Sequence, residues 1–209
     1  MTGRRPDAPL GLAFLGCGAA TRMHSRTLAR LRAPVLRYYA SRDPARARAF
    51  ARELGGAGTF ESYDAALADP RVDAVLVATP PALHLAHTLA ALEAGKHAIV
   101  EKPAFLRATD FDTVAAAAAA AGRQVLVAEN YFYKPLAERL RAALAAGLVG
   151  DVLFVQVNAV KHQPATGWRG DPALAGGGAL FEGGIHWLNL VANLGLTLVS
   201  TTGVRPGRG

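Results

Sequence analysis

The sequence predicts an α/β protein: a Rossmann-type doubly wound parallel sheet followed by an incomplete α+β second domain. Short apolar runs alternate with segments of helical periodicity between Leu10 and Ala128. A Gly16-Cys17-Gly18 turn joins the first apolar run to the first of these helices. Beyond Asn130 the alternation stops. We therefore expect a dinucleotide-binding domain at 1–130 and a second domain at 131–209.

The expected strands are apolar runs that end in turn residues. The run from Val72 to Ala78 is almost purely apolar, as in a parallel strand that is covered on both faces. The strands predicted in this way are Leu10–Leu15, Val35–Ala40, Val72–Ala78, His97–Val100 and Gln124–Ala128. They alternate with predicted helices at Ala20–Leu31, Pro44–Leu54, Pro81–Ala94 and Arg107–Ala121.

Capping residues and composition fix the ends of these helices. Asp43 and Pro44 form a helix start, and the stretch Gly55–Gly58 is expected to end that helix. Gly95 and Gly122 are stop signals of the same kind. The alanine run at 115–121 favours a helix over disorder, because alanine is the best helix former.

The second part of the chain has fewer elements. The predicted series is a helix at Pro135–Ala146, a strand at Val152–Val160, a loop at His162–Gly178, a helix at Leu180–Leu194 and an apolar stretch at Thr197–Val204. This series contains two strands at most, whereas a stable sheet generally needs three or more. We therefore expect a truncated C-terminal domain concerned with substrate binding or oligomerisation.

Composition narrows the classes of function. The net charge of +7 comes mainly from scattered arginines, without the basic stripe and interleaved aromatics of a nucleic-acid surface. No apolar run approaches the roughly 20 residues of a membrane-spanning helix. The lone Cys17 and the glycine-interrupted first apolar run favour a cytoplasmic protein over an exported one. No cysteine or histidine cluster predicts a metal site.

The Gly16-Cys17-Gly18 turn stands where a dinucleotide pyrophosphate binds in this fold. Glycines permit the tight turn and the close approach of the backbone to the phosphates, which the free amides of the helix N-terminus stabilise. The third glycine of the usual fingerprint falls near Thr21 and is absent. A plain strand-to-helix turn is therefore the alternative.

The end of the second strand predicts which dinucleotide binds. An acidic residue there holds the ribose 2′-hydroxyl of NAD, whereas an arginine accommodates the 2′-phosphate of NADP. Ser41 and Arg42 occupy this position, and they favour NADP. NAD is the alternative, because Asp43 can also reach a ribose and Arg42 can be a plain surface residue.

Further polar residues follow the third and fourth predicted strands at the same carboxyl edge. Thr79-Pro80 follows one strand and Glu101-Lys102 the other, and ligands of open α/β sheets bind at this edge. Lys102 can direct its charge at a substrate hydroxyl or carbonyl. The alternative is a solvated loop lysine.

Glu182 and His186 form the last candidate pair. Their i, i+4 spacing places them on one face of a helix, as an acid/base pair requires. A partly buried structural histidine is the alternative. A metal site is disfavoured, because no second histidine stands at matching spacing.

Taken together, these motifs resemble the glucose-fructose oxidoreductase, inositol dehydrogenase and rhizopine-catabolism (Gfo/Idh/MocA) family from Leu10 to about Leu194. The resemblance rests on Gly16-Cys17-Gly18 with His24, on Val72-Asp73-Ala74-Val75 leading to Ala78-Thr79-Pro80 and His84, on Ala94-Gly95-Lys96-His97 leading to Glu101-Lys102-Pro103, and on the glycine-rich stretch that ends in His186.

The resemblance implies a role for each matching residue. Those placed along the cofactor are Gly16, Gly18, Thr79, Pro80, His84 and Glu101, with Ser41 and Arg42 at the adenosine end. Lys102 matches the active-site lysine and His186 the usual catalytic histidine. Trp168 and Arg169 resemble an element near the nicotinamide and the substrate. Lys102 and His186 are then expected to converge on the far end of the dinucleotide.

The implied activity is hydride transfer between a nicotinamide cofactor and a carbohydrate-like or other small polar substrate. Glu182 and Asn189 stand where the family usually has aspartates, and family members continue well beyond residue 209. A catalytically impaired dinucleotide-binding protein is therefore the alternative. Some relatives instead oxidise transiently during glycoside cleavage or reduce a double bond. An unfinished sheet edge makes a homo-oligomer possible.

Overall fold

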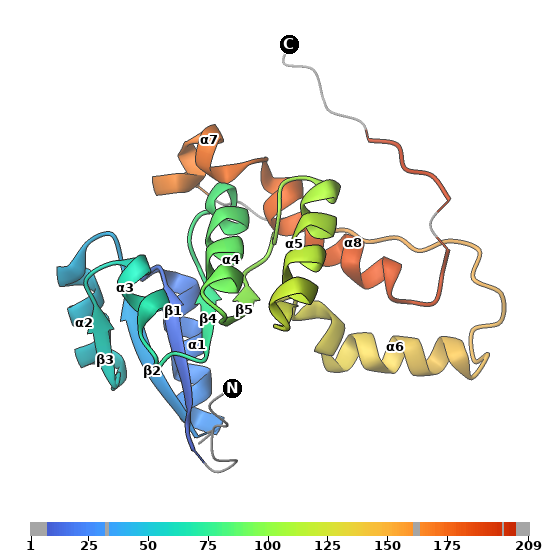
Figure 1. Ribbon diagram of the computed structural model, residues 1–209. Helices are drawn as coiled ribbons and strands as arrows, with labels where there is room; N and C mark the ends of the chain where they lie inside the picture. The colour runs from blue at the N-terminus through green and yellow to red at the C-terminus, as the bar shows by residue number, and fades with distance from the viewer. Residues whose placement is uncertain (1–7, 32–33, 161–163, 198, 204–209) are drawn as a thin grey trace. The chain divides into compact units, whose positions relative to one another are not determined.

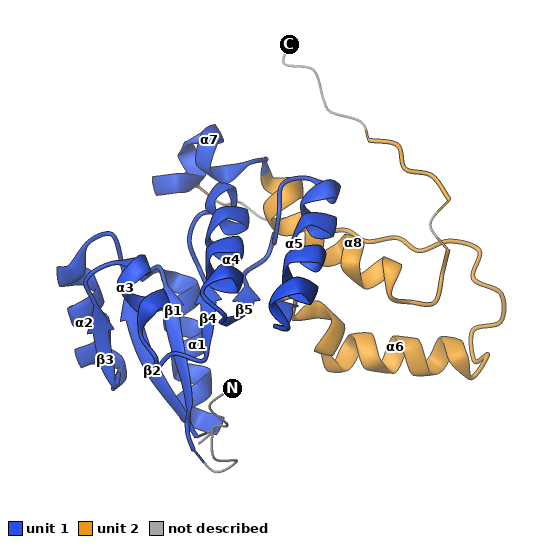
Figure 2. Cartoon of the chain, viewed as in Figure 1, with its two compact units in different colours: residues 1–128, 165–178 blue, residues 129–164, 179–209 orange. Residues whose placement is uncertain are grey.

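The structure is a computed structural model that describes residues 8–31, 34–160, 164–197 and 199–203. The chain divides into two compact units (Figure 2). Unit 1 comprises Met1–Ala128 and Ala165–Gly178, and unit 2 comprises Glu129–Pro164 and Ala179–Gly209.

Unit 1 contains a six-stranded parallel sheet in the order β3-β2-β1-β4-β5-β6 (Figure 1). The strands are β1 (Leu10–Leu15), β2 (Val35–Ala40), β3 (Gly58–Phe60), β4 (Ala74–Val77), β5 (His97–Val100) and β6 (Val125–Val127). The chain winds outward from β1 in one direction and from β4 in the other. Ligands of such sheets bind where the winding reverses, at the carboxyl ends of β1 and β4. The Rossmann-type fold is confirmed.

Among the described residues of unit 1, a short helix α7 (Pro172–Ala175) follows the 3₁₀ turn Gly167–Gly170, and five further helices alternate with the strands. They are α1 (Ala19–Leu31), α2 (Pro44–Leu54), α3 (Tyr63–Ala68), α4 (His84–Glu93) and α5 (Ala108–Ala121). The helix expected at Pro81–Ala94 is a 3₁₀ turn, Pro81–Leu83, followed by α4. Asp43 caps α2 through the amide of Ala45, and Gly55 ends it in the left-handed conformation.

Alternating side chains of the strands build a core on each face of the sheet. On one face Leu12 and Phe14 of β1 pack with Phe50 of α2. On the other face Ala13 and Leu15 belong to a larger cluster that also contains residues of α3, α4 and α5. The pure apolar run of β4 is buried throughout, as expected of a strand covered on both faces.

Two sequence predictions for unit 1 need correction. Gly58 was expected to continue the end of α2, but it begins β3, which pairs with β2. The short α3, capped by the Ser62 hydroxyl, was not predicted either. Both elements are too short to show periodicity in the sequence.

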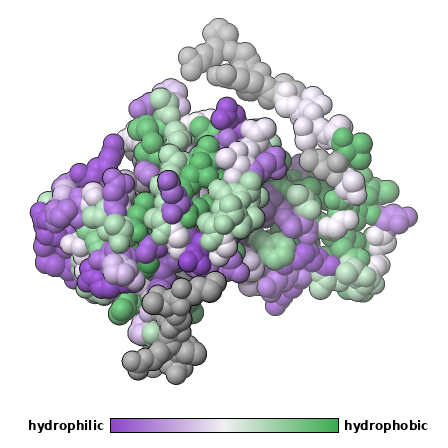
Figure 3. All heavy atoms as spheres, in the orientation of Figure 1, coloured by the Kyte–Doolittle hydropathy of each residue, from purple (hydrophilic) through white to green (hydrophobic). Residues whose placement is uncertain are grey.

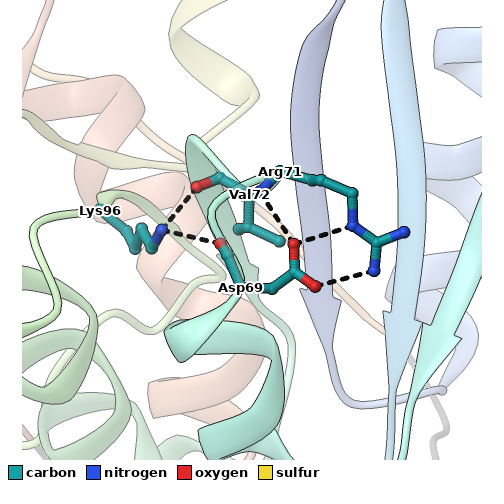
Figure 4. Close-up of polar contacts among 4 residues, drawn as sticks. All are labelled: Asp69, Arg71, Val72 and Lys96. Carbon is teal, nitrogen blue, oxygen red and sulfur yellow. Dashed lines mark hydrogen bonds and ion pairs between the residues drawn. The ribbon is translucent and has the colours of Figure 1, made fainter. Parts of the chain in front are cut away.

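Lys96 forms hydrogen bonds to the turn before β4, on the amino-terminal side of the sheet (Figure 4). Its Nζ donates to the carbonyl oxygens of Asp69 at 3.0 Å and Val72 at 2.8 Å. The Asp69 carboxylate accepts two hydrogen bonds from the Arg71 guanidinium, at 2.9 and 2.7 Å. Lys96, part of the motif that precedes Glu101, therefore holds the turn that leads into β4.

The regular secondary structure in the described residues of unit 2 is helical. It contains a 3₁₀ turn at Tyr131–Tyr133, α6 (Pro135–Ala145), a π-helical turn at Leu180–Gly184 and α8 (Ile185–Ala192). Ala137 of α6 packs against Leu190 and Leu194, with Leu144 and Trp187 at the margin. The helix expected at Leu180–Leu194 thus forms in two parts. No helix of the described chain is long and apolar enough to cross a membrane.

The strand expected at Val152–Val160 is absent. This segment has no regular secondary structure, and Leu153 and Phe154 are 89% and 81% exposed. Hydrophobic residues accordingly reach the surface of unit 2 (Figure 3). A mainly apolar segment becomes a strand only through hydrogen bonds to a neighbour, and no described strand pairs with this segment. The described part of Thr197–Val204 is not a strand either.

Candidate active site

The glycine turn after β1 has the geometry of a phosphate-binding loop. Gly16 has φ +103°, and a Cβ there would lie 2.7 Å from the carbonyl oxygen of Ala78, so only glycine fits. A Cβ on Gly18 would meet nothing within 4 Å. The backbone before α1 is therefore open to a ligand at the helix N-terminus, as a dinucleotide pyrophosphate requires.

Thr21 replaces the third glycine of the fingerprint without closing this loop. Its side chain is fully buried, and its hydroxyl donates to the Gly16 carbonyl oxygen at 2.6 Å. Arg46 of α2 adds a hydrogen bond from its Nε to the carbonyl oxygen of Cys17 at 2.7 Å. The turn is thus held from α1 and from α2. The residues present fit a dinucleotide.

Ser41 and Arg42 follow β2 at the same edge of the sheet. Ser41 is buried, and its hydroxyl accepts the Asp43 amide at 3.2 Å. Arg42 is exposed. One carboxylate oxygen of Asp43 is engaged in capping α2, at 2.9 Å from the Ala45 nitrogen. Burial raises the pKa of the nearby Tyr63 phenol, an effect that the Arg42 charge opposes.

His84 connects the loops that follow β4 and β5. Its ring is 1% exposed; Nε2 lies 2.8 Å from the Thr79 carbonyl oxygen, and Nδ1 lies 2.9 Å from that of Pro103. Burial lowers the pKa of His84, while the carbonyl oxygens oppose this effect. A neutral ring has one N–H and donates to one of these loops. The predicted contact of His84 with the cofactor stays a prediction.

Thr79 has a second histidine partner that the sequence analysis missed. Its hydroxyl lies 3.0 Å from Nδ1 of His87, one turn further along α4. The Tyr63 ring meets the His87 imidazole edge-on at 5.0 Å between centroids. Burial lowers the pKa of His87, which favours the neutral ring. The spacing of His87 from His84 was the available signal.

Glu101 holds the segment that carries Lys102. Its Oε1 lies 2.5 Å from Nε2 of His24 on α1, and its Oε2 accepts the Lys102 amide at 3.0 Å. Burial alone would raise the pKa of Glu101, but the His24 hydrogen bond and charge, with Lys102, hold it below its usual value. Glu101 is thus a carboxylate that links α1 to the loop after β5. Lys102 itself is partly buried, and its peptide bond to Pro103 is cis.

His186 in α8 has a carboxylate partner that sequence reasoning did not find. Its Nδ1 lies 2.8 and 2.9 Å from the two carboxylate oxygens of Glu129. The imidazole also stacks on the Tyr131 ring, with centroids 4.3 Å apart and planes inclined by 14°. The available signal was an acidic residue directly after the strand predicted at 124–128. His186 and Glu129 have side chains only 17% and 10% exposed.

The remaining candidates are divided between the two units. Glu182 lies in the π-helical turn before α8. Trp168 and Arg169 lie in a 3₁₀ turn at Gly167–Gly170, where the guanidinium stands 4.2 Å over the indole. Lys102 belongs to unit 1 and His186 to unit 2. Their convergence on one ligand stays a prediction.

The sequence of the chain matches models of one known protein family. Residues 10–129 match the model of the Gfo/Idh/MocA oxidoreductase family with an NAD-binding Rossmann fold. The chain belongs to the Gfo/Idh/MocA family. Residues 137–204 match a model of the Gfo/Idh/MocA C-terminal domain. The resemblance inferred from the motifs is therefore confirmed.

Individual Gfo/Idh/MocA relatives are named as sugar dehydrogenases or reductases. The chain is 40% identical over 146 residues to D-xylose 1-dehydrogenase (NADP(+)) 2 of Haloferax volcanii, covering 69% of this chain and 45% of the relative. It is 35% identical over 144 residues to 1,5-anhydro-D-fructose reductase of Ensifer adhaerens, covering 68% and 43%. The chain thus spans about half the length of the curated relatives it matches or slightly less.

A solved structure of a Gfo/Idh/MocA member matches both units. Levoglucosan dehydrogenase, in complex with NADH and levoglucosan, aligns with a TM-score of 0.76 at 27% identity. The alignment covers 89% of this chain and 54% of that one. The likeness therefore extends beyond the Rossmann sheet into the described residues of unit 2.

Proposed function

We propose that this protein is an NAD(P)-dependent oxidoreductase that acts on a hydroxyl or carbonyl group of a sugar-like substrate. The observation that carries the proposal is the open glycine turn before α1, where Gly16 cannot hold a Cβ and Gly18 faces free space. The turn stands at the point where the sheet winding reverses, which is where dinucleotides bind. The names of the relatives supply the substrate class.

The proposed chemistry assigns one role to each candidate. A bound nicotinamide supplies the hydride acceptor or donor. Lys102 polarises the substrate oxygen through its charge. His186 accepts the hydroxyl proton during oxidation and returns it during reduction. Glu101 keeps the backbone of Lys102 in place through the amide hydrogen bond described above.

NADP is the proposed cofactor of choice. Arg42 is exposed where a 2′-phosphate would lie, and Asp43 already uses one carboxylate oxygen to cap α2. The relatives include an NADP(+) xylose dehydrogenase and an NADH complex of levoglucosan dehydrogenase. The choice in this chain therefore depends on its own residues.

Cofactor titration followed by a substrate screen tests the proposal. Fluorescence titration should show saturable binding of NADPH, with weaker binding of NADH. Aldoses and anhydrosugars are then supplied with NADP(+), and absorbance at the nicotinamide band reports turnover. Saturable binding without turnover on any sugar would contradict the proposed activity. Absence of binding would contradict the cofactor assignment as well.

A further inference from the structure

The contact between Glu129 and His186 fixes which imidazole nitrogen carries a proton. Both carboxylate oxygens of Glu129 face Nδ1, at 2.8 and 2.9 Å. An ionised carboxylate only accepts hydrogen bonds, so Nδ1 must donate. In the neutral ring the lone pair then lies on Nε2, which is the nitrogen free to accept a proton.

The segment that supplies Glu129 also fixes the plane of the imidazole. Tyr131 stacks against His186 with nearly parallel rings, and Trp187 meets the Tyr131 ring edge-on at 5.1 Å. Nζ of Lys134 stands 3.3 Å from the centroid of the Tyr131 ring. These contacts restrict rotation of the His186 ring, so its Nδ1 is held toward Glu129.

We propose that Glu129 is a positioning residue that locks His186 in its Nδ1–H tautomer and leaves Nε2 as the proton acceptor. This inference rests on the proposed function and names the residue that prepares its base. The sequence pattern predicted an acid/base pair of His186 with Glu182, four residues before it, rather than a contact with Glu129. Among the described residues, however, the carboxylate that contacts the His186 ring is that of Glu129.

The proton and electron balance of the step is simple. During oxidation the substrate O–H bond breaks, and its proton joins Nε2 of His186. The C–H electron pair leaves with its hydrogen as hydride to the nicotinamide, and the carbon–oxygen double bond forms. The Glu129 charge stabilises the resulting imidazolium, as a buried carboxylate does beside a catalytic histidine. Reduction runs the same transfers in reverse.

The test is the tautomer of His186, measured directly. Long-range ¹H–¹⁵N correlation spectra of the ¹⁵N-labelled full chain distinguish Nδ1–H from Nε2–H in a neutral imidazole. The His186 signals are identified by their loss in H186N. We expect the Nδ1–H form in the wild type. We expect Nε2–H in E129Q, because the Tyr131 amide donates to Oε1 of Glu129 at 2.8 Å and so selects the glutamine oxygen at that position, which leaves the NH₂ group facing Nδ1.

Glu138 provides a matched control. It is an exposed glutamate in the first turn of α6, and E138Q removes the same charge from the same unit. We expect E138Q to keep the wild-type tautomer. An Nε2–H signal in the wild type would overturn the proposal without any variant, so a poorly folding E129Q leaves it testable. Retention of Nδ1–H in a folded E129Q would also overturn it.

Kinetics then separate this inference from the proposed function. With a substrate that turns over, E129Q should lose about 10²-fold or more in kcat, within the usual range of general-base catalysis. KM should change by less than about threefold, since Glu129 acts through His186 and not on bound substrate. An expected tautomer change without a loss of kcat would overturn the catalytic part. An inactive wild type would contradict the proposed function and leave the tautomer test intact.

Discussion

At the carboxyl edge of the sheet, some polar side chains are bonded within the protein and others are exposed to a ligand. Glu101 is tied to His24 and to the Lys102 amide, and His84 is enclosed by backbone carbonyl groups. Arg42 is exposed. Substitution of Arg42 or Lys102 therefore probes the ligand more directly than substitution of His84, which would disturb two loops.

Arg42→Asp should reverse the cofactor preference. The change removes a charge partner of the 2′-phosphate and introduces a carboxylate suited to a ribose hydroxyl. We expect NADPH to bind at least about tenfold more weakly, or about 1.4 kcal/mol, and NADH to bind equally well or better. Fluorescence titration measures both affinities.

Arg52→Asp is the control for this experiment. Arg52 is also an exposed arginine, in the last turn of α2, whereas Arg42 precedes the first turn of that helix. The substitution makes the same change in net charge at the opposite end of α2, so the ratio of NADPH to NADH affinity should stay as in the wild type. An unchanged ratio in Arg42→Asp would remove Arg42 from the cofactor site.

Lys102→Ala should abolish turnover while preserving dinucleotide binding. Lys102 is proposed to act on the substrate oxygen, so the dinucleotide affinity should stay within about 1 to 2 kcal/mol of the wild type. Stopped-flow or steady-state absorbance measures turnover, and titration with NADPH shows that the variant is folded. Activity retained at the wild-type level would exclude Lys102 from the mechanism.

The two glycines of the turn after β1 should respond differently to an added methyl group. Gly16→Ala combines a positive φ with a clash against Ala78, and it should cost about 1 to 3 kcal/mol of unfolding free energy. Gly18→Ala has open space and should leave stability nearly unchanged. Its methyl group faces the proposed pyrophosphate, however, so NADPH affinity should fall.

Thermal unfolding and NADPH titration of the two glycine variants together test the loop. A stable Gly18→Ala with wild-type affinity would contradict a phosphate site at this turn. A fully stable Gly16→Ala would contradict the backbone geometry on which the open turn depends.

The Asp69–Arg71 pair at the opposite side of the sheet predicts a dependence of stability on pH. The hydrogen bonds from the Arg71 guanidinium lower the pKa of Asp69 from 3.8 to about 2. A lowered pKa in the folded state stabilises the fold above the unfolded value, and this contribution is lost as pH falls from about 4 toward 2. Because Arg71 is mostly exposed, the effect should be small.

Asp69→Asn measures this contribution. Melting temperatures of the variant and the wild type should differ by a constant amount above about pH 5, and the difference should shrink between about pH 4 and 2. Lys96 donates to backbone carbonyl oxygens and not to the Asp69 carboxylate, so these hydrogen bonds should survive the substitution. A difference that is independent of pH would show that the pair does not titrate as described.

For the whole molecule, local patterns predicted most of the sheet and part of the site. β1, β2, β4, β5 and β6 are confirmed, because buried parallel strands leave continuous apolar runs in the sequence. β3 and α3 were missed, because elements of 3 and 6 residues show no period. The expected strand at 152–160 was wrong, because a mainly apolar sequence alone supplies no hydrogen-bonding neighbour.

The sequence by itself determined the glycine turn and the order of the polar residues along the sheet edge, because a strand, a turn and a helix are encoded by neighbouring residues. Only the tertiary structure decided which side chains the site residues bond to. Glu129 and His186 are 57 positions apart, and His24 and Glu101 are 77 apart. Hydrogen bonds across such distances depend on packing that brings separate elements together, and no local periodicity records it.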